Sequence, residues 1–306
     1  MKSTVYEIVT DRIIEILERG VVPWRKTWND DISVECSYSQ YNYSKKGLRA
    51  YRGINPFLLV GRYASPYWLT YRQCEEMGGH VKKGERGSIV VFWKREEKEL
   101  SIIDAVTGKH KVENRFILRY YNVFNIEQCE GIAGPSQEVK DKSARPLISS
   151  CQSLVDSMKD KPRIIIDSKA YYSPLSDFIG CPSIESFESS EAYYSTLFHE
   201  IGHWTGHSSR LDREGIKSVS FGSEVYSKEE LIAEMSAAFL CDLTGISQKT
   251  LDNSASYIAS WLRSLKNDKT LVVKAAGAAQ RAVDFITKVE PMPAIASSEE
   301  TSLVVV

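Results

Sequence analysis

The sequence lacks any apolar run approaching the roughly 18 residues that cross a bilayer, and its opening residues lack the apolar core of a secretory signal. We therefore expect no membrane partner and a cytoplasmic location. The sequence also lacks closely spaced cysteine pairs, since its 6 cysteines are scattered with no CxxC among them. This spacing excludes a disulfide framework or a Cys-rich zinc module and favours reduced, mostly buried thiols.

The net charge of −1 conceals an excess of opposite sign in the two halves of the chain. Residues 1–131 hold 21 Lys and Arg against 17 Asp and Glu, whereas the remainder holds 18 against 23. Within residues 45–95 the excess is larger, with 11 basic residues against 3 acidic ones. Halves of opposite charge favour two domains with different partners.

The pattern of apolar residues predicts a small sheet with helices in the first half. Apolar residues recur at helical intervals over 3–19, and Thr70 precedes a short helix as an N-cap. The β-branched and aromatic runs at 88–94 and 116–124 predict two paired strands. A further short helix is expected near 56–62.

The second half is predicted to be mostly helical, so the fold class is α+β with two domains. Residues 131–147 are small and polar without periodicity, as in a linker, and separate a domain over 1–130 from one over 148–290. The tail over 291–306 has no pattern able to bury a core, and we expect it to be disordered. The elements expected in the second domain are a helix over 147–159, a strand over 163–167, a loop over 173–182, a short strand over 183–187 and helices over 190–206, 228–245, 250–267 and 270–289.

A candidate metal site lies in the helical pattern over 190–206. His199 and His203 are four residues apart and share one face of the helix, so both imidazoles can bind one ion. Glu200 is one position round the helix and can take a proton from water bound at the open position of the ion. Two imidazoles, a carboxylate and a water form the hydrolytic zinc arrangement. We therefore expect zinc, or another divalent metal in its place.

The third ligand is expected on the helix over 228–245. Glu230 and Glu234 are four residues apart and share a face. We predict that Glu230 binds the metal and that Glu234 hydrogen-bonds the far nitrogen of a ligand histidine. Glu229 stays open as an alternative ligand, although the helix dipole by itself explains an acidic residue in a first turn.

Aromatic and basic residues interleave over 45–95. Proteins hold single-stranded nucleic acid with cations along the phosphates and aromatic rings that stack on the bases. A helix presenting Arg and Asn to base edges, as duplex readers have, is not found. Ordinary packing would place about half of these rings in the core, including Trp68. The residues that we predict to contact DNA on chemistry are Tyr51, Arg52, Trp68, Lys82, Lys83 and Arg86.

Several long motifs, in order along the chain, carry a family resemblance. The first half contains YRGINPFLL at 51–59, VKKGERGSIVVFWK at 81–94 and YYNVFNIEQCEGI at 120–132, and it resembles the ArdC-type single-stranded DNA-binding domain. The second half contains YYSTLFHEIGHWTGHSSRLDR at 193–213 and YSKEELIAEMSAAFLC at 226–241, and it resembles the zincin-like metallopeptidase domain fused to that domain. Together they are similar to ArdC antirestriction proteins of conjugative plasmids and to the N-terminal part of TraC-type primases.

The resemblance implies an antirestriction protein that binds single-stranded DNA entering by conjugation and protects it from host restriction. It also implies that His199 and His203 are metal ligands, that Glu200 is the general base and that the acidic pair lies in the EELIAE stretch. Whether the second domain works as a zinc metallopeptidase stays open. The alternatives are a non-proteolytic DNA-binding protein with a structural metal, or a metallopeptidase acting on a host protein such as a restriction component.

Overall fold

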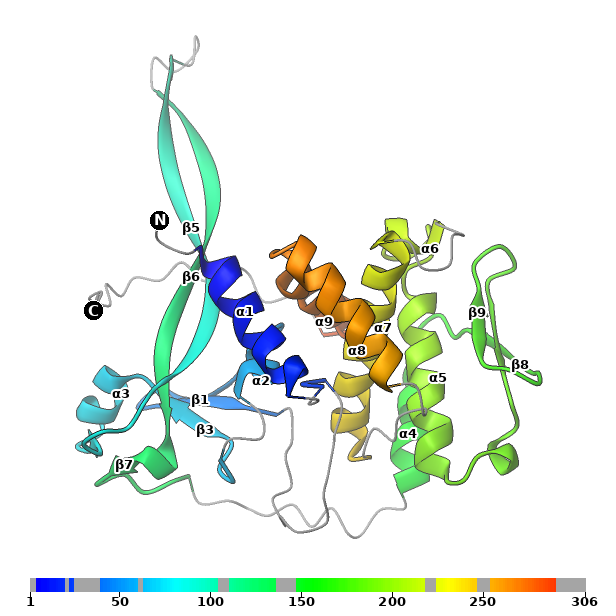
Figure 1. Ribbon diagram of the computed structural model, residues 1–306, viewed down its shortest axis with the longest axis horizontal. Helices are drawn as coiled ribbons and strands as arrows, with labels where there is room; N and C mark the ends of the chain where they lie inside the picture. Colours follow the sequence, from blue (N-terminus) through cyan, green and yellow to red (C-terminus); the bar gives the residue numbers. More distant parts are fainter. Residues whose placement is uncertain are drawn as a thin grey trace.

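The computed structural model confirms the α+β class, with strands and short helices in the first half and mostly helices in the second (Figure 1). The predicted tail over 291–306 and most of the predicted linker lie outside the described residues. None of the helices in the described part of the chain has the length and apolarity that crossing a bilayer requires. The structure describes residues 4–19, 22–24, 39–59, 63–103, 110–135, 147–217, 224–246 and 254–289.

The first half is built on a five-stranded sheet with the strand order β2-β1-β3-β6-β5. Its two long strands are antiparallel and form a hairpin that projects from the body of the molecule (Figure 1). The sequence predicted only the inner parts of these two strands, because charged residues beyond position 94 hide the apolar alternation. The strands are β1 (Tyr41–Ser44), β2 (Gly47–Ala50), β3 (Tyr67–Leu69), β5 (Ser88–Ile103) and β6 (His110–Asn125), with β4 (His80–Val81) and β7 (Cys129–Glu130) paired separately.

The predicted helices of the second half are present, beside a three-stranded sheet with the order β8-β10-β9. Two local predictions are wrong. The expected loop over 173–182 contains β10, and the expected strand over 183–187 is a single 3-10 turn, because Pro182 ends the strand and Ser183 begins the turn. The elements are α4 (Leu147–Ser157), α5 (Ser190–Trp204), α6 (Glu214–Lys217), α7 (Glu224–Thr244), α8 (Ser254–Asn267), α9 (Leu271–Thr287), β8 (Arg163–Ile166), β9 (Tyr171–Ser173) and β10 (Phe178–Cys181).

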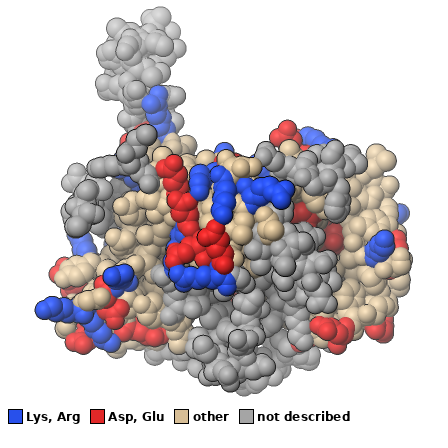
Figure 2. Space-filling view, in the orientation of Figure 1, with Lys and Arg blue, Asp and Glu red and all other residues tan. Residues whose placement is uncertain are grey.

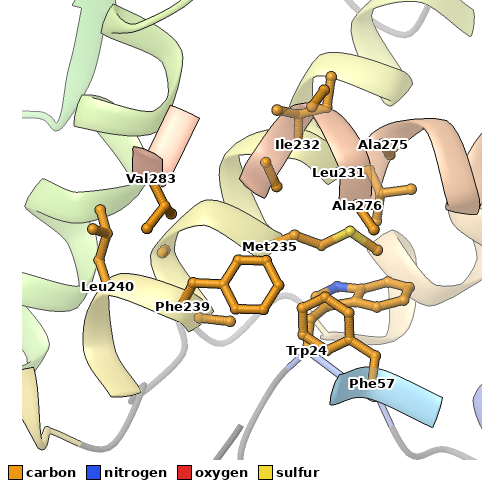
Figure 3. Close-up of a cluster of buried hydrophobic side chains, with 14 of the residues drawn as sticks. Trp24, Phe57, Leu231, Ile232, Met235, Phe239, Leu240, Ala275, Ala276 and Val283 are labelled. Carbon is orange, nitrogen blue, oxygen red and sulfur yellow. The ribbon is translucent and has the colours of Figure 1, made fainter. Parts of the chain in front are cut away.

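One hydrophobic core joins the two halves. Helices α1 (Val5–Glu18) and α2 (Asn55–Leu59) of the first half pack against α7, α8 and α9 of the second. Phe57 of α2 stacks on Phe239 of α7 with ring centroids 4.9 Å apart, and Trp24 lies beside them (Figure 3). Arg52 extends this contact by pairing with Asp284 of α9 at 2.5 Å. The two sequence domains therefore contribute side chains to one hydrophobic cluster.

Asn55 holds the edge strand β5 against α2. Its Nδ2 donates to the Val91 carbonyl at 2.8 Å, and its Oδ1 accepts the Val91 N–H at 2.7 Å. Both residues are buried, with Asn55 only 4% exposed. The side chain thus replaces the neighbouring strand that the edge of the sheet lacks at this point.

We expect Asn55→Ala to lower the free energy of unfolding by on the order of 2–4 kcal/mol, because the N–H and C=O of Val91 would stay buried without partners. Asn122→Ala, on the exposed side of β6, is the control and should change it by less than about 0.5 kcal/mol. Urea unfolding followed by circular dichroism measures both variants. Equal losses in the free energy of unfolding of the two variants would show that the hydrogen bonds from the Asn55 side chain do not hold β5.

Candidate metal centre

Three side chains from two packed helices converge on one point. His199 and His203 come from α5, and their Nε2 atoms are 3.1 Å apart. Glu230 comes from α7 and places one carboxylate oxygen 3.5 Å from His199 Nε2 and the other 3.4 Å from His203 Nε2. All three ligand atoms lie within 4.8 Å of one another.

These spacings fit one divalent cation. Ligand bonds of about 2.0–2.1 Å in a tetrahedral arrangement place neighbouring donor atoms about 3.3 Å apart, close to the separations of 3.1, 3.4 and 3.5 Å. The side chains of His203 and Glu230 are 12% and 11% exposed and that of His199 is 20% exposed, so the centre is largely enclosed and solvent reaches His199 most. Imidazole and carboxylate ligands suit zinc and its neighbours among the transition metals.

A second carboxylate faces the far nitrogen of each histidine. Glu234, predicted to hydrogen-bond a ligand histidine, has its Oε1 3.8 Å from His199 Nδ1, which is longer than a direct hydrogen bond. Glu229 has its Oε1 3.4 Å from His203 Nδ1. Glu229 therefore lies behind His203 and outside the cluster of three ligand atoms. The assignments of Glu230 and Glu234 stay predictions.

Arg213 fixes Glu229 in that position, and no pattern in the sequence pointed to this role. Arg213 Nη2 donates to Glu229 Oε1 at 2.6 Å and its Nε donates to Oε2 at 3.0 Å. The same guanidinium donates to Thr205 Oγ1 at 2.7 Å and to the Gly202 carbonyl at 2.6 Å. It thereby ties the end of α5 to the start of α7, and no helical or strand spacing could predict a contact made from a loop.

The histidines and glutamates of the centre shift one another's pKa values because they lie close together. Burial alone would lower the pKa of His203, but the carboxylates of Glu229 and Glu230 outweigh it and raise that pKa to about 10. Burial would raise the pKa of both glutamates, but hydrogen bonds from the histidines, and from Arg213 to Glu229, hold both below the ordinary range. The cluster therefore favours bound positive charge, and a metal ion competes with protons for the same nitrogens.

Glu200, the predicted general base, follows His199 on α5 and is 7% exposed. Its charge adds to burial in raising the pKa of the Cys181 thiol to about 11, which places it toward β10. A carboxylate in such an enclosed position interacts strongly with a nearby cation because little water screens it. Its negative charge also acts to raise the pKa of both His199 and His203, so it lies within electrostatic range of the two imidazoles.

Arg210 fastens the small sheet to the end of α5. Its guanidinium lies 3.9 Å from the centre of the Trp204 ring and pairs with Asp177 Oδ1 at 2.5 Å. Its Nη2 also donates to the hydroxyl of Tyr172 on β9 at 3.3 Å. The side chain is only 8% exposed. Arg210 thus holds the turn between β9 and β10 beside the helix that carries the histidines.

The structure separates the residues that were predicted to contact DNA. Trp68 is fully buried and donates its Nε1 to Gln40 at 2.6 Å, and Tyr51 is 7% exposed in the same core cluster. Arg52 is held by Asp284. This corrects the prediction for Trp68 and Tyr51, because rings whose faces are covered by core side chains cannot stack on a base.

The three remaining predicted DNA contacts, Lys82, Lys83 and Arg86, are exposed on the turn between β4 and β5. Lys82 also donates its Nζ to the Glu127 carbonyl at 2.9 Å. Lys and Arg side chains project at the corner of the molecule where β7 and α3 (Tyr71–Glu76) lie (Figure 2). A basic turn of this kind can contact phosphates.

Both halves match known families. Residues 3–124 match the N-terminal domain of anti-restriction factor ArdC, and residues 150–278 match a zincin-like metallopeptidase. The crystal structure of metal-free antirestriction ArdC protein from the R388 plasmid is 40% identical, with a TM-score of 0.71 over 93% of this chain and 97% of that chain. The Mn(II)-bound structure of that protein is 37% identical, with a TM-score of 0.68 over 94% and 98%.

Two relatives known from sequence differ in how much of their own length is matched. The uncharacterized protein y4eC of Sinorhizobium fredii is 35% identical over 93% of this chain and 92% of its own length. DNA primase TraC of Escherichia coli is 33% identical over 95% of this chain but only 28% of the primase. The zincin-like match and the Mn(II)-bound neighbour indicate that the centre takes a divalent metal.

We expect Glu230→Ala to weaken divalent-metal binding by more than about 100-fold, because it removes a ligand and not a supporting hydrogen bond. Glu234→Ala is the matched comparison and should weaken binding by about 10-fold to 100-fold. Calorimetric titration of the chelator-treated protein with Zn(II) or Mn(II) measures both. A larger loss in Glu234→Ala would reverse the two assignments.

Arg213→Met should weaken metal binding by about 10-fold to 100-fold, because Glu229 loses the partner that aims it at His203. Lys217→Met, at the end of α6 in an exposed pair with Asp212, is the control and should leave the affinity unchanged. The same titrations test this expectation. A lower melting temperature with unchanged affinity would limit Arg213 to supporting the fold.

Proposed function

Because the chain belongs to the ArdC antirestriction family, we propose that it binds single-stranded DNA entering by conjugation and protects that DNA from host restriction. The observation that carries this proposal is the match to ArdC over almost the whole of both chains, which includes the DNA-binding half and the metal-binding half together. The exposed basic turn at Lys82, Lys83 and Arg86 supports binding to a polyanion. Protection would follow from covering the incoming strand.

We retain the division into a DNA-binding domain over 1–130 and a zincin-like domain over 148–290 as part of the proposal. The shared core between α2 and α7 supports a rigid joint between the domains. The five-stranded sheet of the first half lies toward one end of the long axis of the molecule, and α5 lies toward the other (Figure 1). A change at the metal centre is therefore far from the surface that would hold DNA.

Zinc is the metal that we assign to the centre, with His199, His203 and Glu230 as its ligands. Glu229 and Glu234 would keep the two imidazoles oriented, since each carboxylate faces an Nδ1 atom. When bound, zinc would supply Lewis acidity and an activated water. Glu200 would accept the proton of that water.

A second candidate function is peptidase action on a host protein, such as a restriction component. The observation that favours it is the buried carboxylate of Glu200, whose charge acts on both histidines of the ligand cluster. A metal that only braces the fold needs its ligands but no base next to them. This candidate makes the same metal centre responsible for protection, whereas the first makes the DNA-binding half responsible.

Glu200→Gln separates the two candidates, because it removes the base and keeps the shape of the side chain. We expect unchanged metal content, unchanged affinity for single strands and full protection of plasmid DNA transferred into a restricting recipient. The measurement is the yield of transconjugants in restricting relative to non-restricting recipients, with wild type and no protein as references. Loss of protection with metal and DNA binding intact would make proteolysis the means. Absence of protection by wild type would contradict the proposed function itself.

A further inference from the structure

The β5–β6 hairpin exposes large aromatic side chains where a sheet would normally bury them. Trp93 is 45% exposed, Phe116 is 54% exposed and Tyr120 is 45% exposed. Single exposed rings are common, but several that are adjacent mark a surface that meets a partner. These three residues form what we term the aromatic face of the hairpin.

The strand register places the three rings on one face. Trp93 pairs with Leu118, and Val91 pairs with Tyr120. Phe116, Leu118 and Tyr120 alternate along β6, so their side chains point the same way. Residues opposite each other lie about 5 Å apart and residues two apart along a strand about 7 Å. The three rings therefore surround Leu118, which is only 7% exposed.

Within the described part of the chain, α1 covers the root of this face, and Phe116 and Tyr120 are about half exposed. Tyr6 of α1 meets Trp93 edge-on with ring centroids 6.3 Å apart. Val91 and Leu118 belong to the core that α1 shares. The hairpin continues past the start of α1 (Figure 1). Trp93 is thus anchored by the core on one side, while Phe116 and Tyr120 present their rings to the outside.

The charges of the hairpin complement a polyanion. Its described side chains, over 88–96 and 115–125, include Lys94, Arg95, Arg115 and Arg119 against the single acidic residue Glu96. Arg95 is opposite Phe116 in the register and so lies on the aromatic face. Lys and Arg side chains are visible on the hairpin in Figure 2. The basic turn that ends at Arg86 leads directly into β5, so positive charge precedes the rings along the chain.

We infer that single-stranded DNA lies along the aromatic face, with its bases stacked on Trp93, Phe116 and Tyr120 and its phosphates near Arg95 and the basic turn. Unpaired bases offer free π-faces, whereas the bases of a duplex are covered by their neighbours, so this surface selects single strands. The inference rests on the proposed DNA-binding function and gives it a location. The inference assigns base stacking to exposed rings that a base can reach, and no longer to the buried Trp68 and Tyr51.

The test compares wild type with one double variant that carries both Phe116→Ala and Tyr120→Ala. Both proteins are used as the full chain. Binding of a labelled single strand of mixed sequence is followed by fluorescence anisotropy at several salt concentrations. Each stacked base contributes at least a factor of about 5, so we expect a loss of at least about 20-fold. The salt dependence should be unchanged, because no charge is removed.

Two controls use the same hairpin. Ile117→Ala removes an exposed apolar side chain from the opposite face, where it is 37% exposed, and should change the affinity by less than about 2-fold. The second control is a double variant that carries both Phe116→Tyr and Tyr120→Phe and so keeps an aromatic ring at each position. It should bind single strands as tightly as wild type, and this expectation can be tested even if the alanine variant is poorly folded. Loss of affinity in the ring-preserving variant, with its melting temperature unchanged, would overturn stacking as the mode of binding.

The possible outcomes distinguish an error in the proposed binding site from an error in the proposed DNA-binding function. If wild type does not bind single strands, the proposed function fails. If wild type binds and the folded alanine variant binds equally well, the function stands and the aromatic face is not its site. If the alanine variant keeps its affinity but changes the sedimentation of the protein, the face is a contact between copies of the chain and the inference is overturned.

Discussion

Gly202 of α5 packs directly against the backbone of Ala233 on α7. A Cβ on Gly202 would be 3.1 Å from the Ala233 Cα and 3.3 Å from its carbonyl oxygen. Both distances are to backbone atoms, so a side chain could be admitted only by moving the helices apart. The separation of His199 and His203 from Glu230 is set by that contact, because the ligands come from both helices. The metal centre therefore depends on two small residues that supply no ligand atom themselves.

Helix α7 connects this centre to the other half of the molecule. Its first turns carry the glutamates of the centre, and Phe239 farther along stacks on Phe57 of α2. The residue two before Phe57 is Asn55, which holds the backbone of β5. A continuous series of packed and hydrogen-bonded groups thus runs from the metal centre to the base of the hairpin. The two halves are one physical unit, although their sequences belong to two families.

Two arginine–carboxylate pairs beside α5 have different roles. Glu229 and Arg213 form a pair behind His203 that satisfies both residues and aims the imidazole at the ligand cluster. Arg210 and Asp177 form the second pair and hold the small sheet to the end of α5. Each arginine contributes several planar donors, which a lysine could not supply with the same geometry. Loops that carry no regular structure are in this way fixed against the helix that bears the histidines.

The sequence by itself determined the features that depend on local periodicity. His199 and His203 share a face because any α-helix places residues four apart together, and the same rule brought Glu230 and Glu234 to one side of α7. Only the tertiary structure decided which glutamate faces the ligand nitrogens, because that depends on how α7 is rotated against α5. It also decided which aromatic rings are buried. Trp68 on β3 and Phe116 on β6 are both aromatic residues of the same sheet. Trp68 is buried in a cluster with Tyr51, Leu59, Val90 and Val123. Phe116 on the hairpin is 54% exposed. The two differ because burial depends on contacts between segments far apart in the chain.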